Sequence, residues 1–237
     1  MLCAGTRPSL GTPMSRTDTL ISPRTASPSR AVSRTPAGRS VLHVTTSVEG
    51  DVAAVVRSTV ARDRDAGRNA DWATVSSDGS FPLVSQHLTA ALQGSDAAAA
   101  ELGEPERLTY ASVLRAGAGM LAQIFGRPNL VFLHDPATVG LCRAFKKAGA
   151  TVVWVCHLRV EVPSEASAKA WEFLSPHLDA ADHLIFLQPA AVPKRIEPER
   201  LIVPSSALNR SPVGDPAIKK PEIAATLAHL SPETRSS

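Results

Sequence analysis

The sequence predicts an α/β protein built on a Rossmann-like, open and mostly parallel sheet with helices on both faces. Two observations predict this fold class. Short runs of Val, Ile, Leu and Phe alternate along the chain with segments in which apolar residues recur at helical spacing. Strands that are apolar throughout indicate a parallel sheet covered on both faces, and one such domain fits the length of 237 residues.

The first half of the chain contributes two β–α units and a long helix. The β-branched run "VLHVTTS" (41–47) predicts a strand, and the helical spacing of valines in 49–67 predicts a helix that ends at Gly67. A second strand is expected at 71–77. The next helix, 82–94, has a proline near its start and a glycine after its end. Residues 106–125 predict a longer helix, which Gly117 and Gly119 loosen.

The second half continues the same alternation. Apolar runs predict strands at 129–133, 151–156 and 183–187, with a last extended segment at 200–204. Helices are expected between them at 137–148 and 165–178. Residues 41–210 are therefore assigned to one Rossmann-like domain.

The segments on either side of this domain differ in composition. Residues 1–40 consist mainly of Ser, Thr, Pro, Arg and Ala with no hydrophobic period, a composition that predicts a disordered tail. They carry six arginines against one aspartate, a net +5, which leaves −2 for residues 41–237 of the total +3. Residues 211–237 are expected to be a truncated interdomain segment or tail.

Several classes of function are disfavoured by the composition. A mildly acidic body with 4% aromatic residues lacks the basic stripe and stacking platform of a nucleic-acid binder. No apolar run reaches the roughly 20 residues of a membrane span. Three cysteines without metal-ligand spacing predict no zinc site and no disulfide framework, and they favour a cytoplasmic protein.

The carboxyl ends of the predicted strands carry the titratable residues. In open parallel sheets ligands bind beyond these ends. His134 and Asp135 follow one apolar strand directly, and His157, Arg159 and Glu161 follow the next. A lone histidine or an Asp-Pro turn is ordinary structural chemistry, so the signal lies in their joint location.

The standard nucleotide and hydrolase motifs are missing from the sequence. No G-x-S-x-G elbow and no Walker A loop occur, and the first strand is followed by a single glycine, Gly50, where a dinucleotide fingerprint needs three. No cofactor and no metal are therefore predicted.

Five segments, taken in order, resemble the amino-terminal domain of trehalose-synthase-like enzymes among the family 4 retaining glycosyltransferases. They are "VLHVTTSVEGDVAAVV" (41–56), "LTAALQG" (88–94), "VFLHDPATVGL" (131–141), "WVCHLRVEVPSEASAKAWEFLSPHLDAADHLIF" (154–186) and "IVPSSALN" (202–209). The resemblance implies one lobe of a GT-B enzyme, contributing contacts to the acceptor sugar. The nucleotide-sugar donor would be held by a second Rossmann-like domain, which is not part of this sequence.

The same resemblance selects the candidate site residues. His134, Asp135, Pro136 and His157 match the family's pattern, so the two histidines are expected to contact sugar hydroxyls and Asp135 to orient its neighbour or the acceptor. Arg159 stands where the family has an acid, and a guanidinium donates but cannot accept hydrogen bonds. Further departures are the carboxylates Glu49 and Asp51 beside the first glycine, Thr89-Ala90 in place of His-Asn, and Ser206-Ala207 in place of Ile-Asp.

Three hypotheses about function follow. The first is an acceptor-side glycosyltransferase domain that needs a separate donor-binding chain to transfer glucose from a nucleotide sugar. The second is a degenerate, non-catalytic interaction or regulatory module with an apolar patch beside the strand ends. The third is an independent binder of a small ligand in the same crevice.

Overall fold

The computed structural model describes residues 21–22, 40–75, 79–158, 163–188, 192–193 and 196–202. The strands are β1 (Ile21–Ser22), β2 (Ser40–Thr45), β3 (Asn69–Val75), β4 (Leu130–His134), β5 (Thr151–Cys156), β6 (His183–Phe186) and β7 (Leu201–Ile202). The helices are α1 (Gly50–Asp65), α2 (Phe81–Leu92), α3 (Asp96–Ala100), α4 (Glu104–Phe125), α5 (Cys142–Lys147) and α6 (Glu165–Leu178), with 3-10 turns η1 (Pro136–Leu141) and η3 (Pro198–Arg200).

The described strands form one sheet in the order β1-β3-β2-β4-β5-β6-β7. Every neighbouring pair is parallel except β1 and β3, which run antiparallel. The chain moves outward from β2 to β3 and then returns to place β4 on the other side of β2. The strand order therefore reverses between β2 and β4, and this point is where open α/β sheets bind their ligands.

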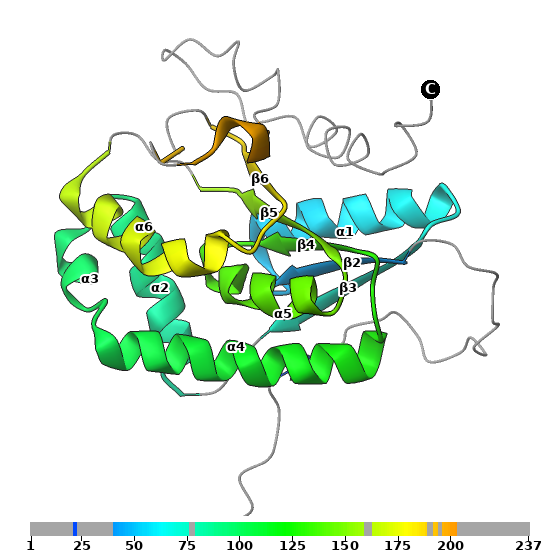
Figure 1. Ribbon diagram of the computed structural model, residues 1–237, viewed down its shortest axis with the longest axis horizontal. Helices are drawn as coiled ribbons and strands as arrows, with labels where there is room; N and C mark the ends of the chain where they lie inside the picture. Colours follow the sequence, from blue (N-terminus) through cyan, green and yellow to red (C-terminus); the bar gives the residue numbers. More distant parts are fainter. Residues whose placement is uncertain are drawn as a thin grey trace, which may run out of the picture.

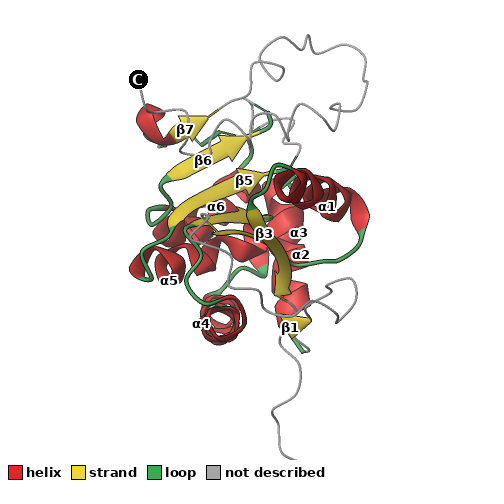
Figure 2. Ribbon diagram, turned by 90° about the vertical axis from the view of Figure 1, so that its right-hand side faces the viewer, coloured by secondary structure: helices red, strands yellow, loops and turns green. Residues whose placement is uncertain are grey.

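Helices cover both faces of the sheet (Figures 1 and 2). Helix α1 lies on one face, over a smaller apolar cluster that includes Val56, Phe132 and Val155. Helices α2, α4, α5 and α6 lie on the other face, over the larger cluster around Leu133, Trp154 and other buried residues. The predicted Rossmann-like α/β class is thus confirmed.

The amphipathic helices form where the sequence predicts them, with boundary differences of a few residues. The predicted helix at 137–148 begins as the 3-10 turn η1 and becomes α-helical only at Cys142. Three elements are absent from the prediction: the short helix α3, strand β1 and the 3-10 turn η3. Ser95 caps α3 by accepting a hydrogen bond from the Ala98 amide at 3.3 Å. The glycines of α4 differ in their surroundings. Gly117 is buried, with the position of an added Cβ 3.2 Å from Val75 Cγ1, whereas Gly119 faces open space.

Strand β1 lies inside the segment predicted to be a disordered tail. It pairs Ile21 with Val75 and Ser22 with Thr74. Nearer the start of β3, the Arg64 side chain of α1 donates from Nε to the Ala70 carbonyl at 2.7 Å. Residues 1–20, 23–39 and 203–237 lie outside the described residues, so for them the predicted tails and domain boundaries stay predictions.

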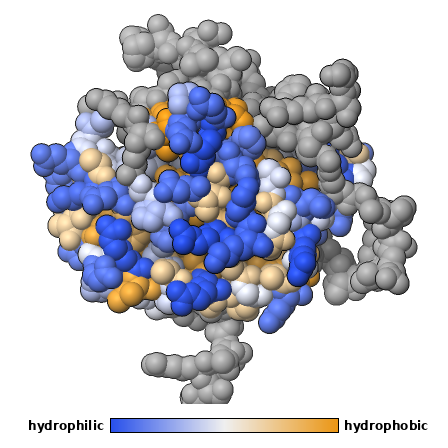
Figure 3. All heavy atoms as spheres, in the orientation of Figure 1, coloured by the Kyte–Doolittle hydropathy of each residue, from blue (hydrophilic) through white to orange (hydrophobic). Residues whose placement is uncertain are grey.

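The surface seen in Figure 3 is mainly hydrophilic, with small hydrophobic areas between the polar ones. Three large hydrophobic side chains are exposed among the described residues: Leu83 on α2, and Leu108 and Ile124 on α4. Leu108 and Ile124 are about 24 Å apart along α4 at 1.5 Å per residue, so these two do not share a patch. None of the described helices is both long and apolar enough to cross a membrane.

Candidate functional site

The candidate site lies where the strand order reverses, at the carboxyl ends of β2 and β4. Thr46 follows β2 and Asp135 follows β4, and the Thr46 hydroxyl donates to Asp135 Oδ2 at 3.4 Å. Asp135 is half-buried. Burial raises the pKa of its carboxyl, and the hydrogen bonds from Thr46 oppose that shift. The carboxyl group is therefore held beside Thr46 in a residue that is half-buried.

The backbone of Asp135 is strained. Its φ of 73° makes it the single non-glycine residue with positive φ in the described part of the chain. With ψ at 149° it occupies a region that is essentially reserved for glycine, at a cost of about 1–3 kcal/mol. Such strain persists only where the surroundings fix the backbone, and it is typical of binding sites.

Three groups fix this peptide. The Asp135 carbonyl accepts hydrogen bonds from Trp154 Nε1 at 3.0 Å, from the Thr138 hydroxyl at 2.9 Å and from the Thr138 amide at 3.1 Å. The next carbonyl, that of Pro136, accepts from the buried Tyr110 hydroxyl at 3.0 Å. The His-Asp-Pro triplet therefore ends a buried strand and also presents a carboxylate at the rim.

Three histidines form a hydrogen-bonded chain across the α1 face of the sheet, and we call His43, His134 and His157 the histidine chain. His43 Nδ1 lies 3.0 Å from His134 Nε2, and His134 Nδ1 lies 2.9 Å from His157 Nε2. His43 comes from the middle of β2, His134 ends β4, and His157 follows β5. The chain thus crosses the point where the strand order reverses.

The inner end of the histidine chain contacts a partly buried ion pair between Asp63 and Arg68. His43 Nε2 lies 3.7 Å from Asp63 Oδ2, and Arg68 donates to Asp63 Oδ1 at 2.8 Å. Burial raises the pKa of Asp63, but its contacts with His43 and Arg68 lower it by more, so the net pKa lies below its ordinary value. Asp63 is therefore an ionised carboxylate at neutral pH.

The histidines themselves are neutral at pH 7. Burial lowers the pKa of His43 despite the nearby Asp63, and burial together with the neighbouring histidines lowers that of His134 well below 6.5. Burial also lowers the pKa of His157 to about 4. A neutral imidazole has one donor and one acceptor nitrogen, so the hydrogen bonds along the histidine chain all run in one direction.

The arrangement does not suit a metal ion. The histidine rings bond to one another in series instead of converging on a point, and the described residues contain no group of three or more His, Cys, Asp or Glu side chains placed to hold one. Hydrogen bonding to sugar hydroxyls is chemistry that the half-buried His157 and Asp135 can perform.

The structure brings three of the four predicted site residues together, with different roles. His157 and Asp135 lie at the rim, but His134 is fully buried and uses both ring nitrogens within the histidine chain. His134 therefore lies behind His157 in the histidine chain, and its contact with a sugar stays a prediction. Arg159 and Glu161 lie outside the described residues.

Sequence reasoning missed the inner part of the site. His43 and Asp63 were assigned to a strand and a helix without a functional role. The available signal was a histidine in the middle of an otherwise apolar strand, since such a residue needs a polar partner on the face that it occupies.

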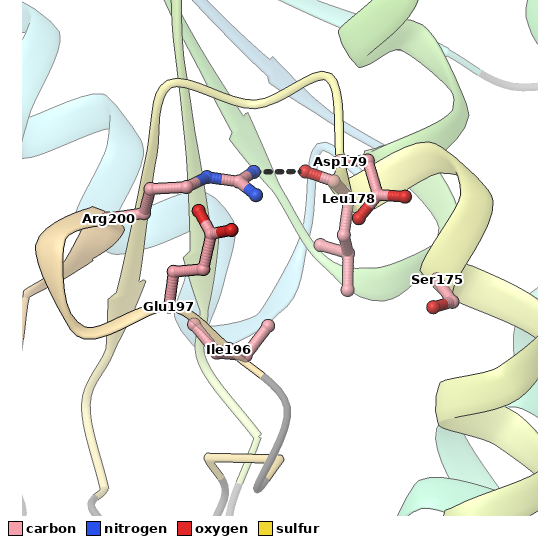
Figure 4. Close-up of a pocket in the computed structure, with 6 residues that line it drawn as sticks. All are labelled: Ser175, Leu178, Asp179, Ile196, Glu197 and Arg200. Carbon is pink, nitrogen blue, oxygen red and sulfur yellow. Dashed lines mark hydrogen bonds between the residues drawn. The ribbon is translucent and has the colours of Figure 1, made fainter.

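A small pocket lies away from this site (Figure 4). Its volume is about 80 Å³, and Ser175, Leu178, Asp179, Ile196, Glu197 and Arg200 line it. Arg200 donates to the carbonyls of Leu178 at 2.6 Å and Ala181 at 2.7 Å. It therefore supplies hydrogen bonds to carbonyl groups at the end of α6 that have no partner within the helix. The pocket therefore lies where the segment after β6 packs against the end of α6.

An open, mostly parallel sheet with helices on both faces defines an α/β domain of the Rossmann-like class. Residues 43–193 match the family model "Trehalose synthase, N-terminal domain". Because this match covers more than half of the chain, the chain belongs to that family, and the predicted resemblance to a glycosyltransferase amino-terminal domain is confirmed.

The proteins similar to the chain include two curated relatives and a solved structure. The trehalose synthase of Rubrobacter xylanophilus is 29% identical over 180 residues, which cover 74% of this chain and 42% of the relative. The trehalose synthase of Pyrococcus horikoshii is 26% identical over 187 residues, covering 78% and 43%. The chain thus spans less than half the length of these relatives.

The solved structure is described as "Trehalose-6-phosphate from E. coli bound with UDP-2-fluoro glucose". The likeness covers 63% of this chain and 40% of that one, with a TM-score of 0.50 and 14% identity. At this level of identity the likeness shows a shared fold.

Proposed function

We propose that this domain is the acceptor-side lobe of a trehalose-synthase-type glycosyltransferase, and that it binds the acceptor sugar at the rim formed by Asp135 and His157. The family membership supports the type of enzyme. The single observation that carries the site is the histidine chain, which joins a buried carboxylate to His157 at the strand reversal. Arg159 belongs to the proposed rim from the sequence alone.

The proposed chemistry is hydrogen bonding and orientation. Asp135 accepts hydrogen bonds from sugar hydroxyls, as carboxylates do, and the His157 imidazole offers one further ring nitrogen. Transfer of glucose also requires groups that stabilise the departing nucleotide diphosphate. We propose that a second Rossmann-like domain, in a separate chain or elsewhere in the protein, binds the donor and supplies them.

Titration of the full chain with glucose tests the sugar site. His157→Ala and Asp135→Asn are each expected to weaken binding roughly 2- to 10-fold, the equivalent of one hydrogen bond of about 0.5–1.5 kcal/mol. His183→Gln, at the opposite end of the parallel strands, is the matched control and should leave binding unchanged. Saturable binding that neither rim variant weakens would refute the assignment.

A mixing experiment tests the need for a donor domain. The part of the Rubrobacter xylanophilus relative that this chain does not match is produced separately and combined with the chain, glucose and a nucleotide-glucose donor. We expect disaccharide only when both proteins are present, and less of it with His157→Ala. Disaccharide formed by the chain alone would contradict the proposal.

A cytosolic location is also part of the proposal. Cys142 and Cys156 are both buried and unpaired, and burial raises the pKa of each thiol to about 12. A thiol with this pKa is protonated and inert at neutral pH, which suits a reducing compartment.

A further inference from the structure

The hydrogen bonds along the histidine chain all run in the same direction, because each neutral ring donates through one nitrogen and accepts through the other. The contacts at the two ends of the chain therefore decide which direction is adopted. Only two arrangements satisfy both bonds of the chain. In one, all three rings carry their proton on Nε2; in the other, all three carry it on Nδ1. Either choice at His43 dictates the choice at His157.

The inner end distinguishes the two arrangements. If His43 carries its proton on Nε2, that N–H faces the ionised Asp63 carboxylate 3.7 Å away. If it carries the proton on Nδ1, the Nε2 lone pair faces the same negative charge inside the protein. Among the described residues no group hydrogen-bonds to this nitrogen, so the charge of Asp63 is the electrostatic influence that it meets. Electrostatic interactions are stronger in a buried environment than in water, so the first arrangement is favoured.

We propose that Asp63 sets the direction of the whole histidine chain and thereby leaves His157 Nδ1 as a hydrogen-bond acceptor at the rim. His43 and His134 carry this effect outward, because their Nδ1 atoms accept from the Nε2–H of the next ring. Asp63 is thus a positioning residue that acts through three rings. The described residues place no hydrogen bond on His157 Nδ1, so this lone pair is available to a ligand O–H.

The inference deepens the proposed function and rests on it for the ligand class. The group that His157 recognises is a hydroxyl that donates, such as a sugar O–H, and the Asp135 carboxylate at the same edge of the sheet is also an acceptor. Two acceptors at this edge select a ligand with hydroxyls that point their hydrogens at the protein. An ether or a deprotonated oxygen at the same place has no hydrogen to give.

Asp63→Asn offers a sharp test because Arg68 controls how the new amide lies. Arg68 can only donate, so it holds the amide oxygen at the position of Oδ1, where it now bonds to Asp63 at 2.8 Å. The amide NH₂ then faces His43 Nε2 at the position of Oδ2, 3.7 Å away, and its positive hydrogens favour a lone pair on that nitrogen. The variant is therefore expected to move the His43 proton from Nε2 to Nδ1. The hydrogen bonds then require the same change of tautomer at His134 and His157.

The experiment is nitrogen NMR of the full chain labelled with ¹⁵N-histidine, without ligand, at pH 7. In the wild type we expect His43, His134 and His157 to carry the proton on Nε2, with His157 Nδ1 in the chemical-shift range of an unprotonated nitrogen. In Asp63→Asn that nitrogen should move to the protonated range. Asp71→Asn, which removes a surface carboxylate bonded to Arg64, is the matched control and should leave all three rings unchanged.

The outcomes separate the inference from the proposed function. Protons on Nδ1 in the wild type, or wild-type tautomers retained in a folded Asp63→Asn variant, would overturn the inference whatever the protein binds. If Asp63→Asn does not fold, the wild-type tautomers decide alone. Glucose added to the labelled wild type tests the sugar site independently: a response at His157 Nδ1 supports it, and no response at any concentration overturns the proposed function while leaving the tautomer result standing.

Discussion

The strained backbone at Asp135 predicts that this residue costs the domain stability. Its φ of 73° and ψ of 149° define a backbone conformation that is favourable for glycine and unfavourable for a residue with a Cβ. Asp135→Gly removes the Cβ, and Asp135→Ala removes the carboxylate but keeps the strain. Comparison of these two variants isolates the backbone contribution from that of the charge.

The magnitude follows from two opposing effects. Relief of the strain is worth about 1–3 kcal/mol. Glycine has more conformational freedom than alanine in the unfolded chain, and this difference lowers the stability of the glycine variant by about 0.4–1 kcal/mol. We therefore expect Asp135→Gly to be about 1 kcal/mol more stable than Asp135→Ala, which for a protein of this size raises the melting temperature by about 2–4 °C.

Urea unfolding followed by circular dichroism measures this difference, and thermal unfolding checks it. Both variants should bind glucose more weakly than the wild type, since both lack the carboxylate. The glycine variant would thus be the more stable protein with the impaired site. Equal stability of the two variants, or a more stable alanine variant, would show that the backbone at Asp135 is not strained.

Three further predictions concern pH and packing. Burial holds the pKa of the histidine chain below 6.5, and that of His157 at about 4, so below pH 6.5 the unfolded chain takes up protons that the folded chain does not. For His157 the free energy of unfolding should therefore fall by up to about 1.4 kcal/mol per pH unit as the pH drops from 6.5 toward 4, and His43 and His134 should add to the fall in the same direction. Urea titrations of His157→Gln should give a shallower slope. Gly119→Ala should stabilise the exposed part of α4 by about 0.8–1.0 kcal/mol in the same assay, whereas Gly117→Ala should give less or none of that gain because the new methyl meets Val75 at 3.2 Å; equal gains would contradict this reasoning. Tyr110→Phe should cost about 2 kcal/mol or more, because it leaves the buried Pro136 carbonyl and the Gly140 amide without the hydroxyl that now bonds both; a thermal melt unchanged from the wild type would contradict it.

The sheet could be predicted from the sequence because its strands are apolar without interruption. The runs "NLVFL" and "TVVWVC" predict buried strands independently of the residues around them. The helices between the strands follow the 3.6-residue period. The carboxyl-end rule then placed Asp135 and His157 at the same edge of the sheet. Strand β1 was not predictable, because two residues carry no periodic signal and their pairing with β3 depends on long-range geometry.

The inner half of the site could not be predicted for a different reason. His43 and Asp63 are 20 residues apart in sequence and belong to a strand and the end of a helix, and only the packing of α1 on the sheet brings them together. Sequence reasoning also treated His134 and His157 as equivalent. What distinguishes them is depth, since β4 ends inside the protein and the chain after β5 emerges at its surface.

Arg64, near the end of α1, covers part of the outer edge of β3. Among the described residues, strand β1 pairs with β3 at Val75 and Thr74. Arg64 hydrogen-bonds to the Ala70 carbonyl and also binds Asp71 at 2.9 Å. A second molecule that tried to extend the sheet would have to displace a charged side chain from that carbonyl, and charged residues at sheet edges oppose such strand addition. Loss of Arg64 would therefore appear as self-association and reduced solubility of the purified protein, and much less as a lower melting temperature.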